Sequence, residues 1–340
     1  MKKFRPEILC LALLLLVMTS PDVFSTILTV SNNSAISAQY SSITAAINAA
    51  NSGDTLYVHG SGTSYGDVTL RKRLVIIGPG YYPADPSGVP AQFGSFYLDT
   101  LNGVSGASGS YFSGLTMNSF NSLSGYSGKI TNNITIKRCK INNSCYIGYS
   151  NTEVHNWILS ESLIYNVSYS TNNSLSSGIL INNCVMSYSS NVYRTIFTNN
   201  VVYNVPNFSE CNVSNCIFIS SAGNNSSVFS TFDNNLFSSA INFTNANNTF
   251  APANQATTNS DPQFAGGTAT GYLTINDYHL QSGSAGHNAG TDGKDLGVYG
   301  GPGIIWGGAP PVPTVYLYSL KPNYVQSNGT LNITIGVKNQ

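Results

Sequence analysis

A short pattern that recurs between Phe112 and Phe237 constrains the fold more than any other feature of this chain. Each copy has an apolar residue, then a Cys, Asn or Ser, then a second apolar residue two places later. Clear copies read ITIKRCKI, ILINNCVM, TIFTNNVV and CNVSNCIF, and equivalent positions lie 16 to 24 residues apart. The aligned column, called here the Cys/Asn/Ser column, consists of Leu115, Cys139, Ser162, Cys184, Asn200, Cys216 and Asn235.

Repeats this short cannot bury an apolar face alone, so they must stack on one another. They are rich in Ile, Val, Phe and Thr and are bounded by Asn, Ser and Gly, which is typical of strands. Coils of ~20 residues, stacked at the ~4.8 Å spacing of neighbouring strands, form a parallel β-helix with ladders of equivalent positions. The sequence therefore predicts an all-β fold, a right-handed parallel β-helix.

Two columns of the repeat have a definite expected geometry. The column before the Cys/Asn/Ser column should adopt the left-handed backbone conformation, which Asn tolerates and in which its amide can bond to neighbouring coils. It consists of Arg138, Glu161, Asn183, Asn199, Asn215 and Asn234. The apolar column two places after the Cys/Asn/Ser column should point into the core. It consists of Ile141, Ile164, Met186, Val202, Phe218 and Phe237.

A third column does not fit a simple alternation of inward and outward residues. It lies directly after the Cys/Asn/Ser column and consists of Lys140, Leu163, Val185, Val201, Ile217 and Leu236. Between two inward columns it must face outward, and a continuous apolar stripe there needs a cover. A C-terminal hairpin from Val315 to Val337 is the first choice. A long loop, a partner, or a bulge that turns the stripe inward are the alternatives.

The chain from about Thr26 to Gly303 resembles the right-handed parallel β-helix superfamily that includes pectate lyases and polygalacturonases. Its closing segment, with DPQF, NDYHL and DLG, resembles that of bacterial β-helix proteins of the choice-of-anchor kind. The residues at 285–288, AGHN, depart from the usual PAID form. The resemblance implies the fold and a final coil in this segment. It does not imply one function, because the fold occurs in lyases, hydrolases, adhesins and inert scaffolds.

Three regions follow from the order of these features. Basic residues followed by an apolar run predict a secretory signal peptide at 1–25, too short to be a stable transmembrane anchor. The β-helix is expected at 26–305, with a short helix from Ser42 to Ala50 covering its open end. A Pro-rich hinge and a C-terminal β-hairpin tail are expected at 306–340. The protein is therefore expected to be secreted, extracellular or at the cell surface.

The charge and the cysteines limit the partners. The formal net charge is zero and only 8% of residues are charged, which gives no reason to expect nucleic acid as a partner. Equivalent cysteines in alternate or more distant coils are ~10 Å or more apart, beyond disulfide reach, so buried free thiols are expected. No metal site is expected. Calcium at Asp277, Asp292 and Asp295 is the one cofactor considered, and their spacing is not diagnostic.

Few ionisable residues lie in the repeats, and the motifs of the polygalacturonases and the Asp cluster of pectate lyases are absent. A polysaccharide lyase or glycoside hydrolase would need convergent carboxylates or a basic residue beside calcium. The candidate catalytic residues are those that neighbouring coils could bring to one wall. They are Lys137, Arg138, Lys140, Glu153, His155, Glu161 and Arg194. The competing interpretation is that Arg138 and Glu161 simply form a structural ion pair.

The other hypothesis is a non-catalytic protein that contacts polysaccharide or another surface component, or serves as a scaffold. The chain has 21 tyrosines, many of them in or beside the coils. Aromatic rings with amide neighbours suit sugar binding, through apolar stacking and hydrogen bonds. The candidate ligand-binding residues are Tyr146, Tyr165, Tyr188 and Tyr203. The sequence does not distinguish this role from a surface that tyrosine merely decorates.

Overall fold

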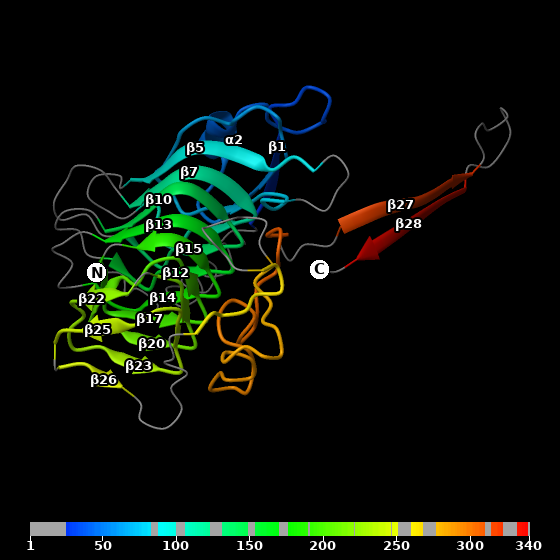
Figure 1. The fold of residues 1–340 in the computed structure, drawn as a ribbon. Helices are drawn as coiled ribbons and strands as arrows, with labels where there is room; N and C mark the ends of the chain where they lie inside the picture. The colour runs from blue at the N-terminus through cyan, green and yellow to red at the C-terminus, as the bar shows by residue number, and fades with distance from the viewer. Residues whose placement is uncertain are drawn as a thin grey trace, which may run out of the picture.

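The computed structural model describes residues 25–82, 88–99, 106–122, 131–148, 154–169, 176–189, 191–220, 222–245, 247–250, 260–267, 277–309, 314–321 and 332–338. From Ile27 to Phe250 the described chain winds as a parallel β-helix, because successive coils add strands to the same two long parallel sheets. Figure 1 shows the strands stacked along one axis. The predicted all-β solenoid is confirmed.

The first sheet has 11 strands and forms one wall of the β-helix. Its outward residues alternate with an inward row that runs from Leu56 to Phe232, all of it buried. In spatial order the strands are β1 (Ile27–Val30), β2 (Thr55–Val58), β4 (Val75–Ile77), β6 (Tyr111–Ser113), β9 (Thr135–Lys137), β12 (Ile158–Ser160), β14 (Ile179–Asn182), β17 (Thr195–Thr198), β20 (Asn212–Ser214), β23 (Thr231–Asp233) and β26 (Thr249–Phe250).

The second sheet has nine strands and forms the opposing wall. They are β3 (Val68–Leu70), β5 (Ala91–Leu98), β7 (Leu115–Ser122), β10 (Lys140–Ile147), β13 (Leu163–Tyr169), β15 (Val185–Ser189), β18 (Val201–Val202), β21 (Ile217–Phe218) and β24 (Leu236–Phe237). Short parallel strand pairs lie outside these two sheets in some of the coils. They are β8 (Thr131–Asn132) with β11 (Val154–His155), β16 (Asn191–Tyr193) with β19 (Asn207–Ser209), and β22 (Gly223–Asn225) with β25 (Ile241–Phe243).

Residues with left-handed backbone form two ladders, one before and one after the strands of the first sheet, and the chain turns at each of them. The predicted ladder, called here the first corner, has φ between 49° and 54° at all six positions from Arg138 to Asn234. The second corner, which precedes strands of the first sheet, was not predicted from the sequence. Its φ lies between 45° and 56° at five positions, and glycines with positive φ occupy two more. These positions are Gly109, Asn133, Asn156, Gly178, Arg194, Glu210 and Phe229.

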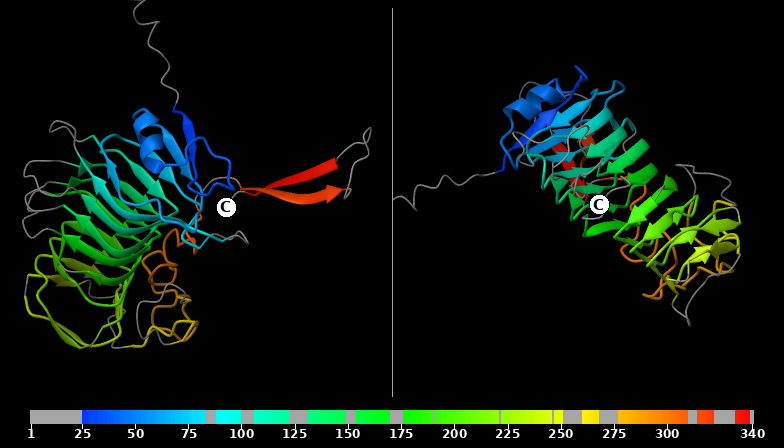
Figure 2. Two further views of the ribbon diagram at one scale, coloured as in Figure 1. Left: turned by 90° about the horizontal axis from the view of Figure 1, so that it is seen from above. Right: turned by 90° about the vertical axis from the view of Figure 1, so that its left-hand side faces the viewer.

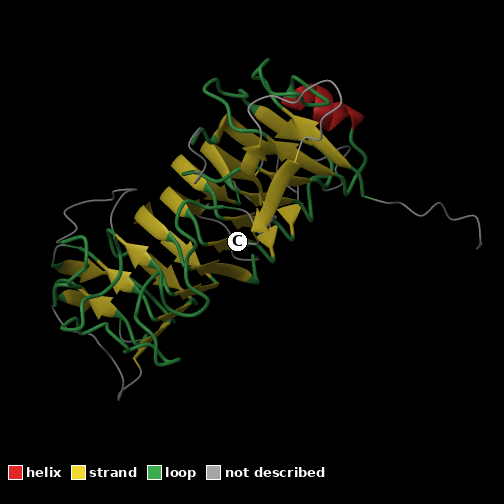
Figure 3. Cartoon of the chain, turned by 90° about the vertical axis from the view of Figure 1, so that its right-hand side faces the viewer, coloured by secondary structure: helices red, strands yellow, loops and turns green. Residues whose placement is uncertain are grey.

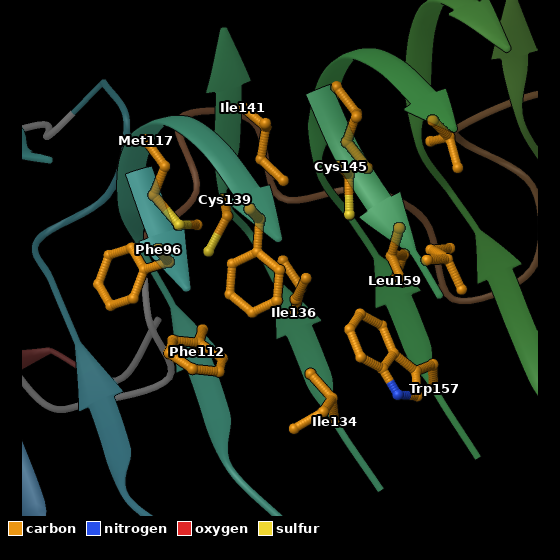
Figure 4. Packing of buried hydrophobic residues seen from close by; sticks show 14 of the residues in the cluster. Phe96, Phe112, Met117, Ile134, Ile136, Cys139, Ile141, Cys145, Trp157 and Leu159 are labelled. Atoms are coloured by element: carbon orange, nitrogen blue, oxygen red, sulfur yellow. The ribbon is translucent and has the colours of Figure 1, made fainter. Parts of the chain in front are cut away.

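The interior is a stack of aromatic, aliphatic and thiol side chains. Figure 4 shows Phe96, Phe112 and Trp157 from different coils beside Cys139 and Cys145, and all five are completely buried. The predicted inward column from Ile141 to Phe237 lies in the same core. Because coils of similar shape stack in register, equivalent rings meet along the axis, as the 6.1 Å separation of the Phe96 and Phe120 ring centroids shows.

The Cys/Asn/Ser column is buried and carries hydrogen bonds that the sheets cannot supply at the first corner. Asn200 Oδ1 accepts from the Cys184 amide at 2.9 Å, and Asn200 Nδ2 donates to the Ile181 carbonyl at 2.9 Å. Asn235 repeats the arrangement two coils later, accepting from the Cys216 amide at 3.0 Å. The column therefore satisfies buried backbone groups between coils, which would otherwise cost free energy.

The short helix α2 (Ile43–Ala49) lies at the N-terminal end of the stack, as Figure 3 shows. The Ser42 side chain accepts from the Ala45 amide, which is the N-cap expected from the sequence. Ile43, Ala46 and Ile47 belong to the main core cluster. The helix therefore covers the apolar cross-section of the first coils.

The apolar stripe faces outward and is covered by residues 260–267 and 277–309, called here the return segment. Leu163, Val185, Val201, Ile217 and Leu236 are all completely buried and form a second cluster, separate from the main core. The return segment contributes Phe264, Tyr278, Leu280, Leu296, Val298 and Ile304 to it. Figures 1 and 2 show this segment running along the outside of the stack. The expectation of a final coil here is wrong, because the segment packs on the outer face.

Hydrogen bonds from the first corner hold the return segment in place. Asn183 Nδ2 donates to the carbonyls of Val298 and Gly300, at 3.0 and 2.8 Å. Asn215 Nδ2 donates to Thr291 Oγ1 at 2.9 Å, and its Oδ1 accepts from the Thr291 amide at 3.1 Å. The same left-handed residues that bend each coil therefore present side-chain amides to the covering chain.

The C-terminal hairpin pairs β27 (Thr314–Lys321) with β28 (Asn332–Lys338) in antiparallel register. The predicted hairpin therefore exists. In both Figure 1 and Figure 2 it projects away from the stack. The prediction that it covers the apolar stripe is wrong, because the return segment occupies that position.

Five of the six cysteines are described, and all five are free and buried, as predicted. Burial raises the pKa of Cys211 to about 11 and the pKa of Cys139, Cys184 and Cys216 to about 12. At pH 8 a thiol with a pKa of 12 is ionised only about once in 10⁴ molecules, and reagents attack the thiolate.

We expect the native protein at pH 8 to react with a thiol reagent at least about a hundredfold more slowly than the unfolded protein. Because the pKa values are raised, the native rate should increase as the pH is raised above 9. After unfolding in guanidinium, these five thiols should all react. Fewer than five reactive thiols in the unfolded chain, or fast native labelling at pH 8, would contradict the assignment of buried free thiols.

Candidate functional site

The charged candidates at the first corner form a compact ion-pair cluster. Glu161 accepts from Arg138 Nε at 2.7 Å and from Lys137 Nζ at 2.8 Å. Arg138 also donates to the Ala309 carbonyl at 3.0 Å, in the return segment. Arg138 and Glu161 are both buried. The cluster thus joins two coils to the return segment, and the expected ion pair between Arg138 and Glu161 is present.

His155 and Arg194 do not converge on this cluster. His155 Nδ1 lies 2.9 Å from Ser177 Oγ, and Arg194 pairs with Glu210 at 2.9 Å, both at the second corner. The width of the first sheet separates the two corners, since β12 connects them within one coil. Lys140 Nζ lies 5.4 Å from the centroid of the Tyr82 ring. Glu153 lies outside the described residues. The candidate catalytic residues that the structure describes therefore do not all form one site.

The acidic residues of the return segment form local pairs. His279 Nδ1 lies 2.6 Å from Asp277 Oδ1, and the His279 ring stacks on Tyr299 with centroids 3.6 Å apart. Hydrogen bonds from the backbone and then the side chain of His279 lower the pKa of Asp277. Asp295 pairs with His287 at 2.8 Å. Among the residues that the structure describes, no three His, Cys, Asp or Glu side chains are placed to hold a metal ion.

The candidate tyrosines lie on the outer face of the second sheet, in three different environments. Tyr165 and Tyr188 are 47% and 45% exposed, on the neighbouring strands β13 and β15. Tyr146 is half-buried on β10. Tyr203 lies under the return segment, with its hydroxyl 3.2 Å from that of Tyr278. Tyr165 and Tyr188 are therefore the pair that a large ligand can reach.

Amide side chains lie beside this exposed pair on β10 and β13, and they were not singled out from the sequence. Asn166 pairs in register with Tyr188, and its Nδ2 donates to Ser144 Oγ at 3.2 Å. Asn142 and Asn143 are exposed at the irregularity where the register of β10 shifts. The Asn-Asn dipeptide inside a strand could have indicated them, because polar residues that interrupt a strand often mark a bulge that exposes side chains.

No helix among the described residues has the length and apolar content that a membrane crossing requires. Comparison with known proteins finds no family model that matches the chain, and no match among curated proteins. The classification that stands on the geometry is a parallel β-helix with an outer return segment and an aromatic, amide-rich patch on its second sheet.

Proposed function

We propose that this protein is an exported, non-catalytic β-helix protein that binds a neutral polysaccharide outside the cell or at its surface. The observation that carries the proposal is the exposed pair Tyr165 and Tyr188 on neighbouring strands, with amides around it. Aromatic faces bind the apolar faces of sugar rings, and amides bind their hydroxyls. Export and kinship with pectate-lyase-like surface proteins are part of the proposal, and they rest on the leader-like and closing sequences.

The ion pairs favour binding over catalysis. A general acid or base needs a carboxylate or basic group directed toward substrate. Glu161 instead accepts from Lys137 and Arg138 inside a cluster that fastens the return segment. Arg194 is engaged by both carboxylate oxygens of Glu210, at 2.9 and 3.2 Å. These charges therefore have structural partners, and the lyase or hydrolase alternative gains no support from their arrangement.

The double variant Tyr165→Ala, Tyr188→Ala should bind neutral polysaccharides at least about tenfold more weakly. Covering one aromatic ring on binding contributes ~1.5 kcal/mol, and 1.4 kcal/mol is tenfold in affinity. Affinity electrophoresis in gels that contain soluble glucans, mannans, xylans or galactans measures the effect. Phe229→Ala is the matched control, because Phe229 is an exposed aromatic residue on the second corner.

Two results would contradict the proposal. Full retardation of the double variant, or loss of retardation in the control, would remove the tyrosine pair from the binding face. Release of unsaturated uronides or reducing ends by the native protein would replace binding with catalysis, above all if Arg138→Ala or Arg194→Ala abolished it.

A further inference from the structure

A second candidate site is a cavity beside β1, β2 and β4, the strands at one end of the first sheet. Loops that follow β1, β2 and β4 enclose a cavity with a volume of about 220 Å³. The cavity is smaller than the roughly 300–1,000 Å³ pockets that hold drug-sized ligands, so it fits a ligand of about one ring. Its lining comprises Asn33, Ile36, Tyr57, His59, Gly60, Ser61, Gly62, Pro79, Gly88 and Val89.

Two aromatic rings form part of the cavity wall. The rings of Tyr57 and His59 meet edge to face, with centroids 5.2 Å apart and an interplanar angle of 86°. Hydrogen bonds to the His59 backbone fix these rings in place. The His59 amide donates to the Val30 carbonyl at 2.9 Å, and the His59 carbonyl accepts from the Tyr65 hydroxyl at 2.8 Å. This part of the wall is thus formed in advance of any ligand, which lowers the entropy cost of binding.

Some polar groups of the lining are unused, although Asn33 Oδ1 accepts from the Ala35 amide and Ser61 Oγ accepts from the Thr63 amide. The ring nitrogens of His59, the hydroxyl of Tyr57 and the Nδ2 of Asn33 make no hydrogen bond to any part of the chain that the structure describes. Burial lowers the pKa of His59, so its imidazole is neutral at pH 7 and offers one donor and one acceptor. Apolar atoms of Ile36, Pro79 and Val89 complete the lining.

Among the residues that the structure describes, the lining contains no Lys, Arg, Asp or Glu. A charged ligand would lose hydration without gaining an ion pair, which disfavours it. A ligand with hydroxyls around an apolar ring face matches both the unused polar groups and the apolar side chains. We propose that this cavity binds one neutral, polyhydroxylated ring of monosaccharide size. It lies at the first sheet, whereas Tyr165 and Tyr188 lie on the second, so the two proposals are independent.

Two glycines of the lining have opposite tolerance for a side chain, which gives a clean test. A Cβ at Gly60 would lie 1.8 Å from the Val89 carbonyl oxygen, so Gly60 is needed for the wall to close. A Cβ at Gly62 meets nothing within 4 Å, and its φ lies outside the left-handed region. Gly62→Leu therefore places a side chain at the cavity without straining the backbone. Gly223 has the same freedom in β22, far along the coils, and Gly223→Leu is the matched control.

The experiment follows the side-chain signals of the four histidines in the full chain by NMR, with His59→Gln to assign the His59 signal. Glucose, galactose, mannose, xylose and N-acetylglucosamine are titrated separately to roughly 50 mM, which covers millimolar dissociation constants. We expect at least one sugar to move the His59 signal in a saturable way. Gly62→Leu should abolish the shift and Gly223→Leu should preserve it. His59→Ala should weaken binding, read by saturation transfer to the sugar, roughly five- to tenfold.

Three results would overturn the proposal. These are no shift with any sugar, an unchanged shift in Gly62→Leu, or saturable binding of cyclohexanol and phenol when no sugar binds. The double variant Tyr165→Ala, Tyr188→Ala should bind the monosaccharide as the native protein does. Failure of the polysaccharide face therefore leaves this result intact, and failure of the cavity leaves polysaccharide retardation intact.

Discussion

Ile217→Asp should detach the return segment and lower the free energy of unfolding by roughly 3–5 kcal/mol, the usual cost of an unpaired buried charge. Ile217 is completely buried between the coil and the return segment. The approach is so close at Gly297 that a Cβ there would lie 2.9 Å from Ile217 Cδ1. The Gly297 amide also donates to the Asn215 carbonyl at 2.8 Å. A carboxylate at this position cannot be hydrated while the return segment stays in place.

Urea unfolding, binding of a hydrophobic dye and limited proteolysis within 277–309 measure the effect. Ile196→Asp is the matched control, because Ile196 is 51% exposed on the first sheet and the same change there should cost less than about 0.5 kcal/mol. Dye binding and cleavage should rise only in Ile217→Asp. If both variants behave alike, the return segment does not depend on the apolar stripe for its position.

The coils could be predicted from the sequence because equivalent positions in successive coils have the same backbone geometry and similar residue types. Asn183, Asn199, Asn215 and Asn234 identify the first corner, since each coil needs left-handed backbone at the same point and Asn adopts it at little cost. The second corner was missed although its backbone is equally regular. Its residues include Arg194, Glu210 and Phe229, so no shared residue type marks it. A ladder of equivalent backbone conformations can be predicted from the sequence only where the residue type also repeats from coil to coil.

The cover of the apolar stripe could not be predicted, because it depends on contacts between residues far apart in the chain. The hairpin was chosen since a two-stranded hairpin lacks a core of its own. Leu280, Leu296 and Val298 are scattered among Gly, Asp and Asn, with no periodicity to indicate an apolar face. The same limit affected the tyrosines. Tyr203 is covered by Tyr278 whereas Tyr188 is exposed, and their local sequences do not distinguish these positions.

Asn200→Leu keeps the branched shape and the number of side-chain heavy atoms, and it should destabilise the protein by roughly 2–5 kcal/mol. Asn200 accepts from the Cys184 amide and donates to the Ile181 carbonyl, and all of these groups are buried. Leucine leaves one donor and one acceptor without partners, and each unsatisfied buried group costs about 1–3 kcal/mol. On the sequence alone an apolar residue in this column looks favourable, because the column also contains Cys and Leu115. The hydrogen bonds reverse that expectation.

Urea unfolding gives the size of the loss, and hydrogen exchange of the Cys184 amide locates it. Asn212→Leu is the control, because Asn212 is exposed on the first sheet and should tolerate the change within about 0.5 kcal/mol. Exchange at Cys184 should accelerate in Asn200→Leu beyond the global loss of stability, because its acceptor is removed directly. Equal stability of the two variants would show that the backbone at the first corner finds other partners, and that the buried Asn residues are there for packing rather than for hydrogen bonding.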